Sequence, residues 1–246
     1  MVKVRDLTVD SPLRESYKAA TPVHYAWQTE GAYVADRERE LVRAAFFPIQ
    51  GRLLDLGCGE GATLFHLGEP EGATGVDLFE EKIAFAKQRL PRCHFLAASA
   101  LDLPFESGSF DHIIVRDVIH HIPEPERLMA EIARVIAPGG RVDVLEPCRY
   151  NPLIAAHALA IPVERGELRS TESYLARLLY SHFDVRDTTR HQGFPIHRII
   201  FHPDLGKPAW AENPTVSGLV SGFERLAEKL LPELMWAYLH LRAFAR

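Results

Sequence analysis

The sequence is poor in cysteine, with three residues at Cys58, Cys93 and Cys148 in a chain of 246. An odd and widely spaced set fits neither a disulfide framework nor a zinc site, and it indicates a reducing compartment such as the cytoplasm. Charge of one sign is also scarce, because the formal net charge is −5 and no basic block occurs. Nucleic acid and other polyanionic partners are therefore disfavoured.

Long hydrophobic runs are missing as well. The longest apolar stretch, residues 153–163, contains His157 and Pro162 and is too short to span a bilayer. The first residues have no apolar segment typical of a signal peptide. We therefore expect a cytoplasmic protein with no integral membrane segment. There is no internal repeat, and the length suits one large domain.

Strand and helix patterns alternate in the first two thirds of the chain. Short apolar runs predict strands at residues 52–56, 73–77, 93–97, 111–116 and 141–146. Apolar residues at helical spacing predict helices at residues 31–47, 62–67, 80–90 and 125–136. This alternation predicts a parallel sheet with helices on both faces. Ligands of such sheets bind at the carboxyl ends of the strands.

The alternation loosens after residue 147. An apolar, proline-containing insertion occupies residues 150–166, and a helix is expected at residues 171–180. Residues 183–189 and 196–202 have the composition of a strand pair. We expect this pair to complete the sheet with an antiparallel strand.

The tail, residues 216–244, has a strongly amphipathic helical pattern with a break expected near Pro232. Its apolar face consists of Leu219, Phe223, Leu226, Leu230, Leu234, Tyr238 and Leu241. This face could pack within the molecule, form a homodimer interface or contact a membrane surface. Acidic residues among the basic ones weaken the membrane interpretation, and packing within the molecule is the default.

A glycine-rich loop follows the first expected strand, in the segment LLDLGCGEG of residues 53–61. A sharp turn that presents backbone N–H groups to a ligand requires positions without a Cβ, as at Gly57, Gly59 and Gly61. Asp77, at the end of the second strand, is placed to accept hydrogen bonds from a ribose diol. The same loop also satisfies the pattern of nicotinamide-dependent enzymes, so it leaves two nucleotide cofactors open.

Two further motifs separate these alternatives. The segment LPFESGSFD (residues 103–111) precedes the fourth strand, and APGG (residues 137–140) precedes the fifth. Together with DLGCG (residues 55–59), they resemble class I, Rossmann-like S-adenosylmethionine-dependent methyltransferases, specifically the UbiE/COQ5-like small-molecule group. The resemblance covers about residues 50–147. It implies use of S-adenosyl-L-methionine, with S-adenosyl-L-homocysteine as the product.

The resemblance also implies a fold and a division of the chain. The expected fold is α/β and doubly wound, with a mostly parallel seven-stranded sheet and an antiparallel last strand pair. Residues 1–246 then form one methyltransferase domain. Its parts are an N-terminal helical cap (1–47), a cofactor-binding core (48–147), an insertion with sheet completion (148–202) and a C-terminal helical extension (203–246).

By this resemblance the cofactor is held along the strand ends. Its methionine end and sulfonium would meet Asp55, Gly57, Cys58, Gly59, Gly61, Arg116 and Asp117. Its ribose and adenine would meet Asp77, Leu78, Ser99, Ala100 and Leu101. Ser99 stands where the family often has an acidic residue for the adenine amino group. Ser99, the backbone or the nearby Asp102 is therefore expected to make that contact.

Methyl transfer to oxygen or carbon benefits from a base near the acceptor. The candidate catalytic residues are Asp117, His120, His121 and Glu146, with His24 as a weaker candidate. A histidine in this stretch can equally serve packing, so both roles stay open. No metal is expected, since the other histidines, His191, His197 and His202, match no compact metal site.

The acceptor would be bound by segments that cap the strand ends, namely residues 1–30, residues 150–166 and the tail. Their apolar and aromatic composition favours a small hydrophobic or aromatic molecule. Tyr25 and Trp27 could form a lid or be ordinary core aromatics. Two alternatives remain. One is a nicotinamide-dependent oxidoreductase, for which residues 103–111 have no role, and the other is a non-catalytic cofactor-binding module.

Overall fold

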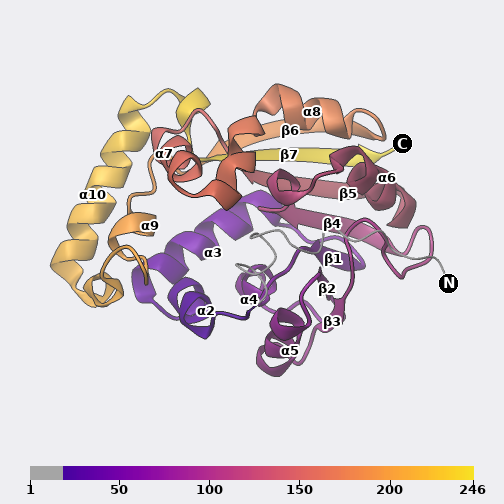
Figure 1. The fold of residues 1–246 in the computed structure, drawn as a ribbon, viewed down its shortest axis with the longest axis horizontal. Helices are drawn as coiled ribbons and strands as arrows, with labels where there is room; N and C mark the ends of the chain where they lie inside the picture. The colour runs from indigo at the N-terminus through magenta and orange to yellow at the C-terminus, as the bar shows by residue number, and fades with distance from the viewer. Residues whose placement is uncertain (1–18) are drawn as a thin grey trace.

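The computed structural model describes residues 19–246, which form a seven-stranded sheet of order β3-β2-β1-β4-β5-β7-β6 (Figure 1). The strands are β1 (Leu53–Leu56), β2 (Thr74–Asp77), β3 (His94–Ala97), β4 (Phe110–Arg116), β5 (Ile136–Pro147), β6 (Phe183–His191) and β7 (Tyr238–Ala245). The first five strands are parallel, and β7 runs antiparallel to β5 and β6. The expected α/β fold with an antiparallel last strand pair is confirmed.

Helices cover both faces of this sheet. They are α2 (Pro22–Thr29), α3 (Ala32–Phe46), α4 (Ala62–His66), α5 (Glu80–Arg89), α6 (Pro125–Val135), α7 (Pro152–Ala160), α8 (Glu172–Leu179), α9 (His197–Ile200) and α10 (Pro214–Leu230). The described residues also form four 3-10 turns, η1 (Ile119–His121), η2 (Pro162–Arg169), η3 (Pro208–Glu212) and η4 (Glu233–Met235). None of the helices within residues 19–246 has both the length and the apolarity needed to cross a bilayer.

Alternating side chains of the buried strands build two cores. In β4, Ile113 and Val115 pack with apolar residues of α6 and α8 on one face. Ile114 points to the other face, where it packs with residues of α3, α4 and α5. Both faces are buried because each is covered by helices, and this explains the continuous apolar sequence of β4.

Several helix starts are fixed by side-chain caps that the sequence supplies. The Asn151 side chain accepts the N–H groups of Leu153 and Ile154 at the start of α7. Asn213 caps α10 in the same way, and Thr171 caps α8. Such caps satisfy N–H groups that have no partner within the helix.

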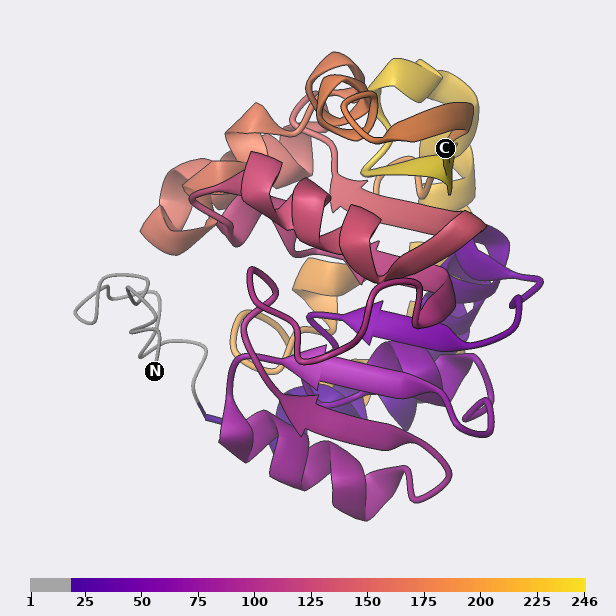
Figure 2. The same ribbon diagram turned by 90° about the vertical axis from the view of Figure 1, so that its right-hand side faces the viewer.

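The topology places a ligand crevice at the ends of the central strands. β1 lies between β2 and β4, because the chain runs from β1 outward to β2 and β3 and then crosses back to β4 on the other side of β1. Such a switch point opens a crevice outside the carboxyl ends of the strands. Figure 2 shows α7 and η2 on the side to which the parallel strands point. The part of the expected N-terminal cap before residue 19 lies outside the described residues.

The expected strand at residues 196–202 is wrong. Residues 197–200 form the short helix α9, and the partner of β6 is β7, residues 238–245 of the tail. Leu239, Leu241 and Ala243 of β7 are fully buried. The expectation of a wholly helical extension over residues 203–246 is therefore also corrected.

The expectation that the apolar tail face packs within the molecule is wrong for α10. Leu219 is 71% exposed and Leu230 is 72% exposed. The helix docks through Val220, which is buried with Val34 and Phe201, and through Glu224, which is buried and lies 2.7 Å from Nδ1 of His197. Its other oxygen accepts the Tyr33 hydroxyl at 3.0 Å. These polar contacts set the rotation of α10, and its helix ends at Leu230 before the expected break at Pro232.

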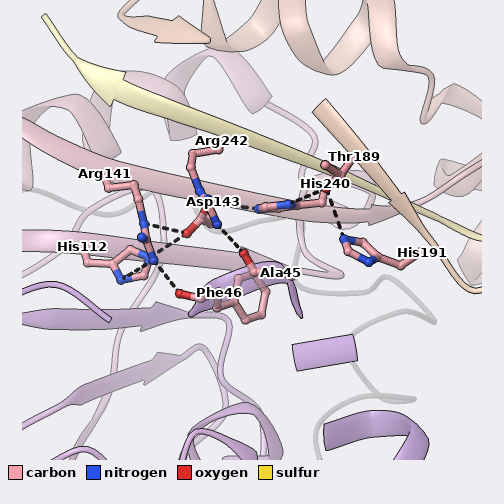
Figure 3. Close-up of polar contacts among 9 residues, drawn as sticks. All are labelled: Ala45, Phe46, His112, Arg141, Asp143, Thr189, His191, His240 and Arg242. Atoms are coloured by element: carbon pink, nitrogen blue, oxygen red, sulfur yellow. Dashed lines mark hydrogen bonds and ion pairs between the residues drawn. The ribbon is translucent and has the colours of Figure 1, made fainter. Parts of the chain in front are cut away.

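A buried carboxylate joins the middle of the sheet to its antiparallel half (Figure 3). Asp143 of β5 has both oxygens engaged: Oδ2 lies 2.8 Å from His112 Nε2 and 2.9 Å from Arg141 Nε. Its Oδ1 lies 3.0 Å from His240 Nε2 and 2.9 Å from Arg242 Nε. Burial alone would raise the pKa of Asp143, but these hydrogen bonds and charges hold it well below its usual range.

The same cluster fastens the end of α3 to the sheet. Arg141 Nη2 donates to the carbonyl of Phe46 at 2.5 Å, and Arg242 Nη2 donates to the carbonyl of Ala45 at 2.8 Å. These carbonyls lie in the last turn of a helix, where no intrahelical donor remains. Asp143 thereby orients the two arginines that cap α3.

We expect Asp143→Asn to lower the free energy of unfolding by about 3–5 kcal/mol, because two arginines lose a buried anion. Urea denaturation followed by circular dichroism measures this change. Asp184→Asn is the matched control on β6. Asp184 and its partner Arg186 have side chains 60% and 62% exposed, so the loss should stay below about 1 kcal/mol. Equal losses in the two variants would contradict the role of the cluster.

Candidate functional site

The loop after β1 turns through three glycines with positive φ. The angle is +78° at Gly57, +53° at Gly59 and +89° at Gly61, a region that other residues rarely adopt. A Cβ on Gly57 would lie 2.3 Å from Cγ2 of Val118, whereas one on Gly59 would meet no described atom within 4 Å. The loop is therefore packed against the β4 side at Gly57 and has open space beside Gly59.

Asp77 ends β2 beside this loop. Its Oδ2 accepts the N–H of Gly59 at 3.0 Å, and its Oδ1 accepts the N–H of Phe79 at 3.0 Å. Each carboxylate oxygen keeps a further lone pair, so Asp77 can still accept hydrogen bonds from a diol. The next residue, Leu78, is 40% exposed and offers an apolar surface. This pairing suits a nucleoside with its ribose on Asp77.

Asp55 has a buried carboxylate oxygen that accepts no hydrogen bond from the described residues. The residue is 1% exposed, and its Oδ2 has no hydrogen-bond partner among the described residues. Burial raises the pKa of Asp55 to about 7, although the charge of Arg116 opposes this shift. A buried acceptor without a donor costs about 1–3 kcal/mol. A ligand that brings an N–H donor to Asp55 would remove that cost.

The turn after β3 lies beside β2 at the same edge of the sheet. Ala98 donates its N–H to the carbonyl of Asp77 at 2.9 Å. Ser99 Oγ accepts the N–H of Leu101 at 3.2 Å, and Leu101 is buried in the core. The Ser99 hydroxyl therefore stabilises its own turn and keeps its proton available for donation. Asp102 is exposed.

Arg116 pairs with Glu38, a residue that no sequence motif linked to the site. Its Nη2 donates to Oε2 of Glu38 at 2.6 Å, and its Nε lies 3.4 Å from Oδ2 of Asp117. Arg198 of α9 is also hydrogen-bonded to Glu38. Burial alone would raise the pKa of Glu38, but Arg198 and Arg116 lower it to about 2. Glu38 lies on the apolar face of α3. A charged residue at such a position is the sign in the sequence that it has a buried partner.

Glu146, at the end of β5, holds the turn that follows β4. Its Oε1 accepts the N–H groups of Val118 and Ile119, each at 2.8 Å. Its Oε2 lies 2.6 Å from Nδ1 of His120 and accepts the His120 N–H at 3.3 Å. The carboxylate is fully buried. Glu146 thus positions residues 118–120, and Asp117 before them adopts a φ of +55°.

The histidines of η1 also meet an acidic residue from the insertion. Oε2 of Glu164, in η2, lies 3.6 Å from Nε2 of His120 and 3.8 Å from Nε2 of His121. The His120 side chain is 3% exposed, that of His121 is 23% exposed and that of Asp117 is 37% exposed. Among the candidate catalytic residues, Asp117 and His121 are therefore the accessible ones. Glu164 belongs to no recognisable motif, so it could not be selected from the sequence alone.

His24, the weaker catalytic candidate, lies beside His202 and Asp204. Its Nε2 lies 2.8 Å from Oδ2 of Asp204, within hydrogen-bond distance. Tyr25 is 5% exposed and packs edge-on against the rings of Phe65 and Phe85, so it is a core aromatic residue. A cavity of about 290 Å³ lies between α2 and the start of α4 and includes Glu60 in its lining.

Comparisons with known proteins agree with this geometry. A family model described as "Methyltransferase domain" matches residues 54–143. An O-methyltransferase, cnsE, of Penicillium expansum is 30% identical over 53% of this chain and 52% of its own length. Demethylmenaquinone methyltransferase of Lactococcus lactis is 34% identical over 47% of this chain and 51% of its own length. The chain thus spans about half the length of the curated relatives that it matches.

Solved structures show the same fold. A SAM-dependent methyltransferase of Thermotoga maritima, described as a possible histamine N-methyltransferase, has a TM-score of 0.62 at 17% identity. The comparison covers 91% of this chain and 94% of that one. Geranyl diphosphate C-methyltransferase of Streptomyces coelicolor, solved with Mg²⁺ and S-adenosyl-L-homocysteine, has a TM-score of 0.59 at 17% identity. That comparison covers 93% of this chain and 87% of the relative.

We expect Glu38→Gln to lower the free energy of unfolding by about 3 kcal/mol at pH 6, a figure that follows from its lowered pKa. The pKa in the folded protein, about 2, lies below the ordinary value of 4.5. The stabilisation is therefore present above pH 4.5 and is lost as the pH falls toward 2. Urea denaturation between pH 2.5 and pH 7 should show the difference from wild type shrinking at the acidic end.

Glu40→Gln is the control on the same helix. The Glu40 side chain is 65% exposed and pairs with Arg37, so the variant should lose less than about 1 kcal/mol. A Glu38→Gln deficit that stays constant down to the lowest pH would contradict the ion-pair explanation.

Proposed function

We propose that this protein, through a class I, Rossmann-like methyltransferase domain, transfers a methyl group from S-adenosyl-L-methionine to a small acceptor. The observation that carries this proposal is the open backbone at Gly59, in a loop that follows β1 and is hydrogen-bonded to Asp77. Asp55 of β1 has an Oδ2 without a hydrogen-bond partner among residues 19–246, and Asp77 ends β2. The donor has an ammonium group that suits Asp55 and a ribose diol that suits Asp77, and its methionine chain would lie along the open backbone at Gly59.

Each chain segment at the strand ends would hold one part of the donor. Asp55 would accept the ammonium of the methionine end, and the loop through Gly57, Cys58, Gly59 and Gly61 would pack along it. Asp77 would accept the ribose hydroxyls. The adenine would lie among Leu78, Ser99, Ala100 and Leu101. Arg116 is held by Glu38, so it would act through the position of the Asp117 turn.

When bound, S-adenosyl-L-methionine supplies a methyl group on a positively charged sulfur, and S-adenosyl-L-homocysteine is the product. The protein mainly aligns the two reactants. Asp117 and His121 are the accessible polar residues of the turn after β4, so they would contact the acceptor. His120 and Glu146 are buried, and they would position that turn.

The insertion supports a hydrophobic or aromatic acceptor. The sequence of α7, PLIAAHALA, is almost entirely apolar. It leads directly into η2, which packs on η1, since a Cβ on Gly166 would lie 1.9 Å from the carbonyl oxygen of His120. η2 thus covers the turn that carries the candidate catalytic residues, and α7 before it adds apolar side chains.

Two alternatives are less well supported. A nicotinamide-dependent oxidoreductase could use the same loop and Asp77, but the family match over residues 54–143 includes the segments that have no role in such an enzyme. A non-catalytic cofactor-binding module would keep the donor site and lack turnover. Release of S-adenosyl-L-homocysteine in the presence of a panel of hydrophobic and aromatic acceptors distinguishes catalysis from binding.

We expect Gly59→Ala to weaken S-adenosyl-L-homocysteine binding at least tenfold, because the new Cβ enters the space reserved for the ligand. Isothermal titration calorimetry measures the affinity. Gly72→Ala is a matched control, since Gly72 also has a positive φ, +74°, and no described atom within 4 Å of an added Cβ. Both variants should lose about 1 kcal/mol of stability from backbone strain. Only Gly59→Ala should lose affinity.

Equal affinities in the two glycine variants would contradict the donor site at this loop. Binding of NADH in place of S-adenosyl-L-homocysteine by the wild-type protein would instead favour the oxidoreductase.

A further inference from the structure

Three potential metal ligands converge at the carboxyl end of β4. η1 supplies His120 and His121, and η2 supplies Glu164 from the insertion. One ligand atom from each residue can be chosen so that all three lie within 4.8 Å of one another. The carboxylate oxygen lies 3.6 Å from His120 Nε2 and 3.8 Å from His121 Nε2. An ion about 2.0–2.2 Å from each ligand can join ligand atoms up to about 4.4 Å apart, so the two carboxylate–imidazole separations suit it as they stand.

We propose that His120, His121 and Glu164 bind a divalent transition-metal ion such as Zn²⁺, Mn²⁺ or Fe²⁺. Two imidazoles and one carboxylate form a ligand set that these ions accept readily. Three protein ligands leave at least one coordination position for water or for a substrate oxygen.

The orientation of His120 supports the site independently of its distance to Glu164. Glu146 Oε2 lies 2.6 Å from Nδ1 of His120, which leaves Nε2 of the same ring directed toward Glu164. Histidines that bind metals usually donate their second ring N–H to a carboxylate or a carbonyl, which fixes the tautomer and the ring. The fully buried Glu146 provides that arrangement here.

The backbone around the three ligands is held in place. A Cβ on Gly166 would lie 1.9 Å from the carbonyl oxygen of His120, so η2 approaches η1 as closely as glycine permits. Arg169 Nη2 donates to the same carbonyl at 3.4 Å. The ligand side chains of His120, His121 and Glu164 are 3%, 23% and 13% exposed. The site is sheltered and can still be reached from solvent through the His121 side.

The described residues contain one other cluster with metal-binding potential, formed by His24, His202 and Asp204. Its carboxylate is 68% exposed and already lies 2.8 Å from His24 Nε2. It resembles the first cluster in ligand type but is far more open to solvent. It therefore serves as an internal control.

A metal ion bound at η1 restricts the chemical class of the acceptor. This conclusion rests on the proposed methyl transfer. The ion would be held in part by His121, beside which the proposed function places the acceptor. A bound cation lowers the pKa of a coordinated hydroxyl and orients it. The structure then favours an acceptor that presents a hydroxyl oxygen, and hence O-methylation.

Cobalt(II) titration of the chelator-treated, full-length protein tests the site directly, because bound Co²⁺ absorbs visible light. We expect one equivalent to bind and Zn²⁺ to displace it. Glu164→Gln and His121→Gln should each weaken Co²⁺ binding at least tenfold, with unchanged circular dichroism and thermal midpoints close to wild type. His202→Gln, in the other cluster, should bind Co²⁺ like the wild type.

Failure of the wild-type protein to bind Co²⁺ would overturn the proposal. Retained affinity in both Glu164→Gln and His121→Gln, or loss of affinity in His202→Gln alone, would also overturn it. Calorimetry with S-adenosyl-L-homocysteine on the same samples keeps the two proposals separate. Donor binding without Co²⁺ binding removes only the metal site, whereas Co²⁺ binding without donor binding removes only the proposed methyl transfer.

Discussion

The carboxylate of Glu146 accepts hydrogen bonds from three backbone N–H groups and lies against one imidazole in the turn after β4. That turn connects the two halves of the candidate site. On one side Val118 fills the space that a Cβ of Gly57 would need, so the turn lies against the glycine loop. On the other side the carbonyl of His120 excludes a Cβ from Gly166, so the turn lies against η2. One buried carboxylate thus fixes the distance between the donor loop and the insertion that covers the acceptor side.

The parallel half of the fold could be predicted from the sequence because its signals are local. Each strand there is a short apolar run, and β1 and β2 are followed by the glycine loop and by a helix. The antiparallel half depends on contacts between distant segments. Residues 238–245 continue an apolar spacing that fits a helix, and only their pairing with β5 and β6 makes them a strand. The exposed face of α10 has the same origin, because Glu224 forms buried polar contacts that determine which side of the helix faces inward.

The candidate site could likewise be predicted where its signals are local and not where it depends on contacts between distant segments. The glycines, Asp55 and Asp77 lie in one continuous strand–loop–helix–strand segment, residues 53–77, and such a segment brings them to one edge of the sheet. Glu38 and Glu164 come from a helix before this segment and from an insertion after it, so no spacing relates them to their partners. A charged residue on the apolar face of residues 31–47 was the one available sign of Glu38. For Glu164 the chain offers no local sign, and its meeting with His120 depends on how η2 packs.

A crystal structure of the full chain with S-adenosyl-L-homocysteine is the most direct test of the donor site. The expected complex has the ribose hydroxyls on Asp77 and the amino group on Oδ2 of Asp55, with the sulfur facing Asp117. The opposite result is a ligand bound away from this loop, for example in the apolar cavity of about 300 Å³ that includes Phe194 and Phe223 in its lining. Asp55 Oδ2 would then still lack a donor, and the assignment of the glycine loop to the methyl donor would be contradicted.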